Sequence, residues 1–253
     1  MSEHSYISFR YPNFFFSQRE LFLNSDYNIS VAHVLNDVVS CYEKYFINVH
    51  RHTLIVINEP SREGPLTEYE SYTIYLAVND LMANGGCRYD WSKYIYQFSH
   101  EFCHYMNFGH VIKSLRWFEE SICEMASFFF LYEMSSLYSN RQQEEWNIFA
   151  PFLIDYAKLS MQKAEAFDLF ALSDPSSDIS TYLSIQEYDR KKNAFVAINL
   201  LQLFKENTEL WKVIPHLPCV TALSFPQALN ELQNLANMDL TSIASLFGIS
   251  LDK

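Results

Sequence analysis

The sequence predicts an α+β protein in which a small N-terminal lobe with a mixed sheet packs on a mainly helical C-terminal lobe. Hydrophobic residues make up 49% of the 253 residues, which is enough to bury a sizeable core. Glycine (5) and proline (8) are too scarce for a loop-rich sandwich or barrel. Alternating apolar residues occur only before about residue 98, and helical spacing dominates after it. We therefore place the lobes at residues 1–98 and 99–253.

The first lobe is expected to contain three strands and one helix. A weak alternation predicts a strand over residues 6–11, and apolar residues at three-and-four spacing predict a helix over 29–46. The segments TLIVI (53–57) and YTIYLAV (72–78) are rich in β-branched and aromatic residues, so they predict two further strands. Prolines and a glycine between these two strands predict a loop.

The second lobe is expected to be helical because apolar residues keep a helical period from Trp91 onward. Several of these segments begin with Asp, Ser or Pro, which favour helix N-termini. The expected helices span residues 92–107, 115–137, 144–158, 186–206, 226–236 and 240–247. No repeat or Pro/Gly-rich linker separates the lobes, so we expect one unit with a cleft at their junction.

The net charge of -12 argues against binding to nucleic acid or to an anionic membrane, since both need clustered Lys and Arg. The N-terminus does not resemble a signal peptide, and no stretch reaches the roughly 20 apolar residues of a membrane-spanning helix. The five cysteines form no C-x-x-C pair, which predicts reduced thiols in a cytoplasmic protein. Cys103 and Cys123 are expected to be packing residues rather than ligands or nucleophiles.

The segment HEFCH (100–104) has the pattern H-E-x-x-H. On a helix, His100 and His104 lie one turn apart on the same face, so both imidazoles can reach a single zinc ion. Glu101 lies on the adjoining edge, where it can take a proton from a water that the metal activates. An apolar stripe on the same helix is expected to pack against the rest of the protein and so bury this helix.

A catalytic zinc site needs a third protein ligand, and His110 is one candidate. The segment HEFCHYMNFGH resembles the metzincin pattern H-E-x-x-H-x-x-G-x-x-H, with Asn107 in place of the glycine. Asparagine tolerates the left-handed conformation that such a turn requires. No methionine turn of the metzincin kind is visible downstream.

Glu120 is the other candidate. The segment WFEESICE (117–124) resembles the W-L-x-E-G-x-A-E segment of the gluzincin metallopeptidases, the group with thermolysin-like enzymes and zinc aminopeptidases. The resemblance implies a zincin-like fold and makes Glu120 the third zinc ligand. Ser121 and Cys123 replace the family's glycine and alanine, and both are small enough for close helix packing. We expect Glu119 on a solvated face and Glu124 in a supporting or surface role.

The same resemblance implies a tyrosine that donates a hydrogen bond to the oxyanion of the reaction. Tyr188-Asp189-Arg190-Lys191 is similar to the Y-x-K-G segment of gluzincin aminopeptidases, although it lacks the glycine. Tyr188 is therefore the expected donor, with Tyr182 and Tyr156 as rivals. The G-x-M-E-N segment that grips a substrate amino terminus is missing, so aminopeptidase activity is not inferred.

These features predict a zinc-dependent metallopeptidase that hydrolyses a peptide or protein substrate. The expected ligands are His100, His104 and Glu120, with Glu101 as general base and Tyr188 as oxyanion donor. The strand over 72–78 is expected to pair with an extended substrate. Two alternatives stay open: a metzincin-like peptidase that uses His110, and a helical binding or scaffold protein with a vacant or structural metal site.

Overall fold

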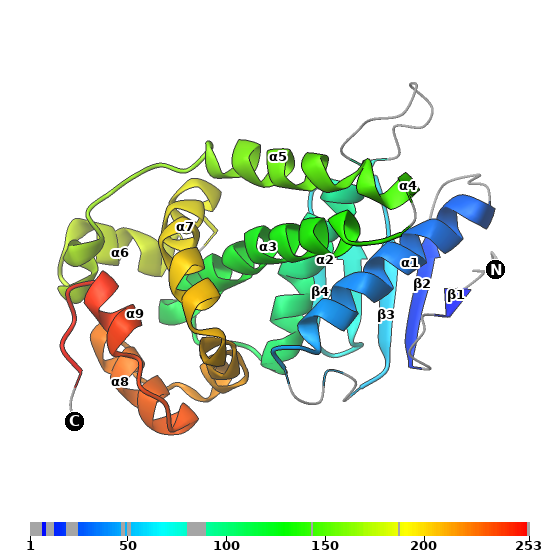
Figure 1. Ribbon diagram of the computed structural model, residues 1–253. Coiled ribbons are helices and arrows are strands. Elements are labelled where there is room, and N and C mark those ends of the chain that lie inside the picture. Colours follow the sequence, from blue (N-terminus) through cyan, green and yellow to red (C-terminus); the bar gives the residue numbers. More distant parts are fainter. Residues whose placement is uncertain are drawn as a thin grey trace. The chain divides into compact units, whose positions relative to one another are not determined.

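The computed structural model (Figure 1) describes residues 7–8, 13–18, 25–46, 49, 52–79, 90–142, 144–186 and 188–251. It confirms the α+β class, because helices predominate and one small mixed sheet is formed near the N-terminus. Within the described part of the chain, no helix combines the length and the apolar character needed to cross a membrane.

The sheet has five strands in the order β1-β2-β3-β5-β4. The central strands β2, β3 and β5 run parallel, whereas β1 and β4 are antiparallel to their single neighbours at the two edges. The bounds are β1 Ile7–Ser8, β2 Phe14–Gln18, β3 Leu54–Asn58, β4 Leu66–Glu68 and β5 Thr73–Leu76. Of the strand expected over residues 6–11, the structure describes only β1.

The prediction that the strand over residues 72–78 can pair with a substrate is wrong. The segment predicted over 72–78 forms β5, which pairs with β3 on one side and with β4 on the other. The edge strand next to β5 is β4, which lies within a region that the sequence predicts to be a loop. β4 has three residues and only its middle residue, Thr67, is buried, so it is too short to show an alternating pattern.

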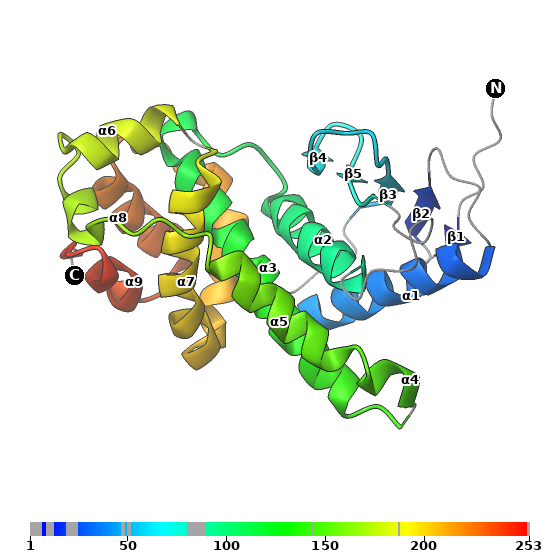
Figure 2. The same cartoon turned by 90° about the horizontal axis from the view of Figure 1, so that it is seen from above.

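Two helices cover one face of this sheet (Figure 2). Helix α1 (Ser25–Tyr42) connects the parallel strands β2 and β3, as parallel neighbours require a crossover. Helix α2 (Asp90–Asn107) packs its aromatic stripe on the same face: the Phe102 ring centroid lies 6.0 Å from that of Phe14 and 4.9 Å from that of Tyr42. Phe98, Phe102 and Tyr105 are buried, as predicted. Phe108, the fourth residue of the predicted stripe, follows the end of α2 and is only half-buried.

The remaining α-helices follow α2 along the chain. They are α3 (Arg116–Ser139), α4 (Glu144–Asn147), α5 (Ala150–Met161), α6 (Asp178–Ile185), α7 (Arg190–Glu206), α8 (Phe225–Ala236) and α9 (Thr241–Leu246). Short 3-10 segments span η2 (Lys113–Leu115), η3 (Leu169–Ser173) and η4 (Thr208–Cys219). The helix expected over 144–158 is divided into α4 and α5, and α6 and η4 were not expected.

Helix α7 begins four residues later than the sequence predicts. Its N-cap is Asp189, whose carboxylate accepts hydrogen bonds from the backbone amides of Lys191 and Lys192 at 3.1 Å each. An aspartate in this position satisfies amides that have no partner within the helix, which is why the helix starts here.

The chain groups into two compact units. The first comprises residues 1–105 and 127–158, and the second comprises 106–126 and 159–253. In the first, the Tyr42 ring stacks on Phe130 with centroids 3.7 Å apart. In the second, Trp117 and Phe118 on α3 pack against Phe225 on α8. This grouping differs from a single boundary at residue 98, because α3 contributes its first half to one unit and its second half to the other.

Candidate metal centre

Helix α2 carries the H-E-x-x-H segment in its last two turns. The imidazole rings of His100 and His104 have centroids 5.1 Å apart, as expected for residues one helical turn apart on one face. His100 is half-buried, and His104 is buried with 9% of its surface exposed. Two ring nitrogens are thus presented side by side on a largely desolvated helix face.

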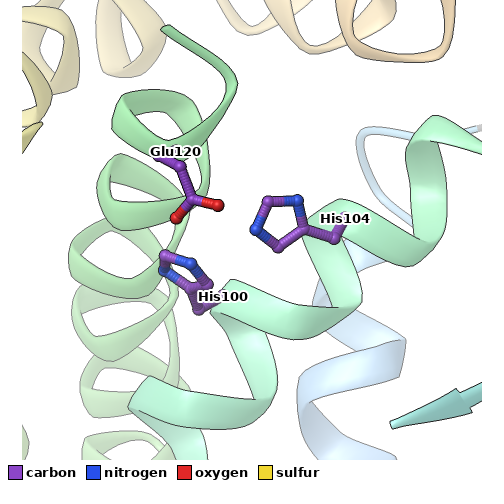
Figure 3. A group of neighbouring side chains, drawn as sticks. All are labelled: His100, His104 and Glu120. Carbon is purple, nitrogen blue, oxygen red and sulfur yellow. The ribbon is translucent and has the colours of Figure 1, made fainter. Parts of the chain in front are cut away.

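Glu120, in the first half of α3, completes this group. One ligand atom from each of His100, His104 and Glu120 lies within 4.8 Å of the others. Figure 3 shows the carboxylate pointing from α3 toward the two imidazoles on α2. Among the described residues, no other set of three histidine, cysteine or acidic side chains converges in this way.

The chemistry of this donor set fits a zinc ion. Two imidazole nitrogens and one carboxylate oxygen are a ligand combination of catalytic zinc sites, in which the fourth position takes water or substrate. Tetrahedral bonds of about 2.0–2.1 Å place ligand atoms about 3.4 Å apart, so the three side chains would draw together slightly around the ion.

His110 does not belong to the converging group and is exposed. The turn before it also differs from the expected one. Asn107 is the last residue of α2, and the left-handed residue is Phe108, with φ +58°. The expectation that Asn107 makes the turn is therefore wrong. Its side chain is instead engaged with α3.

Glu119 is buried, with 3% of its surface exposed, so its expected place on a solvated face is wrong. Its carboxyl oxygen Oε1 accepts a hydrogen bond from Nδ2 of Asn107, which is also buried, at 2.5 Å. A buried carboxyl group needs such a polar partner, and the helix pattern alone does not reveal that one exists. This bond ties the end of α2 to the start of α3, next to Glu120.

Glu101 is 4% exposed and contacts the edge strand of the sheet. The Thr67 hydroxyl lies 2.9 Å from the Glu101 carboxyl oxygen Oε2 and 2.8 Å from the Glu101 backbone oxygen. Sequence reasoning missed Thr67 because β4 was not predicted. The available signal was the short Leu-Thr-Glu segment before a turn and a strong strand, which is a hairpin pattern.

The tyrosines considered for the oxyanion lie on later elements. Tyr188 precedes α7 and is 60% exposed. The Tyr182 hydroxyl donates a hydrogen bond to the Asp189 carboxylate at 2.8 Å, and this bond raises the pKa of Tyr182. Tyr156, on α5, contacts Tyr96 edge-on. Because Tyr182 already serves the cap of α7, it is the weaker rival, and the role of Tyr188 stays a prediction.

The cysteines near the centre are buried and form no disulfide bond. Cys103 and Cys123 have no exposed surface and lie outside the metal-binding group, consistent with packing. Ser121 is equally buried, and its hydroxyl donates to the Trp117 carbonyl within α3 at 2.8 Å. Cys87 lies outside the described residues. Ser121 and Cys123 are thus both small, buried side chains of α3.

Comparisons with known proteins add no evidence about this centre. No family model matches the sequence, and no curated protein or solved structure matches it significantly. The resemblance of the motif residues to gluzincins therefore stays a prediction from the sequence.

Proposed function

We propose that this protein is a zinc-dependent metallopeptidase with a zincin-like arrangement of helices and sheet. One observation carries the proposal: an H-E-x-x-H helix and a glutamate from the next helix bring three ligand atoms within 4.8 Å of one another. Glu101, which follows His100 in the sequence and is 4% exposed, is the proposed base. The reduced, cytoplasmic setting inferred from the cysteines belongs to the same proposal.

The proposed reaction is hydrolysis of a peptide bond. A zinc ion held by His100, His104 and Glu120 would lower the pKa of a water molecule toward neutrality. Glu101 takes a proton from this water while the water oxygen attacks the peptide carbonyl carbon. Glu101 then gives the proton to the amide nitrogen as the C–N bond breaks. Tyr188 is the proposed hydrogen-bond donor to the oxyanion.

The edge strand β4 is the proposed binding site for the substrate main chain. In the described sheet β4 pairs only with β5, and Thr67 places it beside Glu101. An extended peptide can add to such an edge through backbone hydrogen bonds. The proposed cleft therefore runs along β4 and the histidine face of α2.

Metal analysis of purified variants tests the ligand set. The wild type should contain close to one zinc ion per chain, and His100→Ala or Glu120→Ala should lose it. His110→Ala is the matched control, since His110 lies outside the group and should retain zinc. Loss of zinc in His110→Ala with retention in Glu120→Ala would contradict the assignment and favour the metzincin-like set.

Glu101→Gln separates binding from catalysis. It should keep its zinc and lose at least about 10²-fold in kcat on a quenched fluorogenic peptide, because the general base is gone. A Glu101→Gln variant with unchanged kcat would remove Glu101 from the mechanism. A zinc-free wild type without hydrolysis would favour the scaffold alternative.

A further inference from the structure

Thr67 occupies a buried position at the edge of the sheet where the neighbouring strands carry apolar residues. It is in register with Ile74 on β5, and Ile74 is in register with Val56 on β3. Residues opposite one another in a sheet present their side chains on the same face. Ile74 and Val56 have no exposed surface, whereas Leu66 and Glu68 on either side of Thr67 are exposed. The Thr67 side chain therefore lies in line with the buried side chains of Val56 and Ile74. At the edge of the sheet, this line of apolar side chains ends with the hydroxyl group of Thr67.

Among the residues that the structure describes, the Thr67 hydroxyl makes two hydrogen-bond contacts, both with Glu101. One is 2.8 Å long and reaches the backbone oxygen; the other is 2.9 Å long and reaches the carboxyl oxygen Oε2. A hydroxyl has a single proton to donate, so the two oxygens share it. Together the contacts fix the Glu101 side chain relative to its own backbone. Holding one carboxyl oxygen also fixes the position of the other.

We propose that Thr67 is a positioning residue that orients the carboxyl group of Glu101 toward the metal centre. The assignment rests on the proposed function. It also connects two parts of that function, because β4 is both the strand proposed to bind the peptide and the strand that holds the base. A base must lie within hydrogen-bond distance of its proton, and a misplacement of about 1 Å costs on the order of 10²-fold in rate.

The test compares Thr67→Val, which removes the hydroxyl and keeps a branched side chain, with Thr67→Ser, which keeps the hydroxyl. On the fluorogenic peptide that the wild type cleaves best, Thr67→Val should lower kcat by about 10²-fold, with KM and zinc content unchanged. Thr67→Ser should restore most of kcat. Thr73→Val is the matched control: Thr73 is a buried threonine of the same sheet whose hydroxyl bonds with Ser71, so its kcat should stay within about twofold of wild type.

A second readout does not depend on activity. The thermal midpoint Tm is measured for Thr67→Val, Glu101→Ala and the double variant of the whole chain. If the two side chains interact as described, the sum of the Tm losses of the two single variants should be larger than the Tm loss of the double variant. Additive losses would overturn the proposed contact.

The outcomes separate this assignment from the proposed function. Wild-type kcat in Thr67→Val together with an inactive Glu101→Gln overturns the role of Thr67 and leaves the peptidase intact. Loss of zinc in Thr67→Val, or no rescue by serine, shows a structural role only and also overturns it. A zinc-loaded wild type that cleaves no peptide overturns the proposed function, and the positioning role falls with it.

Discussion

Single residues around the centre divide into those that a motif identifies and those that only the fold brings in. His100, Glu101 and His104 were predicted from the spacing of the H-E-x-x-H motif on a helix. Glu120 was predicted from the resemblance of its segment to that of the gluzincins. Thr67 comes from a distant strand, and the bond from Asn107 to Glu119 depends on how two helices meet. A hairpin pattern can indicate the strand of Thr67, but no sequence pattern indicates either contact, because each joins residues of different elements.

Asn107→Ala should lower the free energy of unfolding by about 1–3 kcal/mol, because the buried Glu119 carboxyl group loses this hydrogen-bond donor. It should also weaken zinc binding, since the bond steadies the start of α3 beside Glu120. Urea unfolding and zinc titration measure the two effects. Asn140→Ala is the control: the exposed Asn140 side chain, just after the end of α3, donates to the backbone oxygen of Ser136 in that helix, and its loss should cost less than about 0.5 kcal/mol. Equal losses of unfolding free energy in Asn107→Ala and Asn140→Ala would contradict the role of the Asn107 side chain in holding the end of α2 to the start of α3.

At the scale of elements, helices were predicted well and short strands were not. The long apolar periods gave α2 and α3 nearly complete, because many residues contribute to each pattern. The three-residue strand β4 has too few residues for any period, and it is the strand that contacts Glu101. The sequence prediction started α7 four residues too early, because Asp189 caps the helix and the described residues between α6 and Asp189 are not helical.

The cap of α7 should make stability depend on pH. Burial tends to raise the pKa of Asp189, but hydrogen bonds from the Tyr182 hydroxyl and from the Lys192 and Lys191 amides outweigh it and lower the pKa below 3.8. When folding lowers the pKa of a carboxyl group, the ionised group stabilises the folded protein at pH values above its pKa in the unfolded chain. This stabilisation is lost as the pH falls through the pKa of the group in the folded protein.

Asp189→Ala should therefore cost about 1 kcal/mol at pH 7 through loss of the cap. The difference in Tm between wild type and variant should narrow as the pH is lowered below 3.8. Asp189→Asn keeps a capping oxygen without the charge, so its Tm difference from wild type should be smaller at pH 7. That difference should also narrow below pH 3.8, because only the wild type has a carboxyl group to protonate at this position. A difference for Asp189→Ala that stays constant between pH 7 and pH 3 would contradict the capping account.

For the whole molecule, the α+β class was predictable and the grouping of the chain was not. Composition and the change of period near residue 98 locate the strands and the helices. They do not show that α3 belongs to two compact units, because a continuous helical period carries no mark at residues 126 and 127.

Zinc should stabilise the whole protein by binding to the folded state. At a free zinc concentration about 100 times Kd, the expected gain is about 2.7 kcal/mol, provided that the unfolded chain binds none. Differential scanning fluorimetry should show Tm rising with zinc and falling again with EDTA. Glu120→Ala should show little response, whereas His110→Ala should respond like the wild type. A Tm that does not change with zinc in the wild type would contradict a site formed by folding.

The interleaving of the two units has a consequence for biosynthesis. The first unit needs residues up to 158, so it cannot finish its core when only its first 105 residues have left the ribosome. By the time its missing helices emerge, the segment 106–126 of the other unit is already outside. For the same reason, no single cut in the chain, whether by a protease or by gene fission, yields either unit by itself. A fragment 1–158 would carry the segment 106–126 of the second unit, and a fragment 106–253 would carry the segment 127–158 of the first.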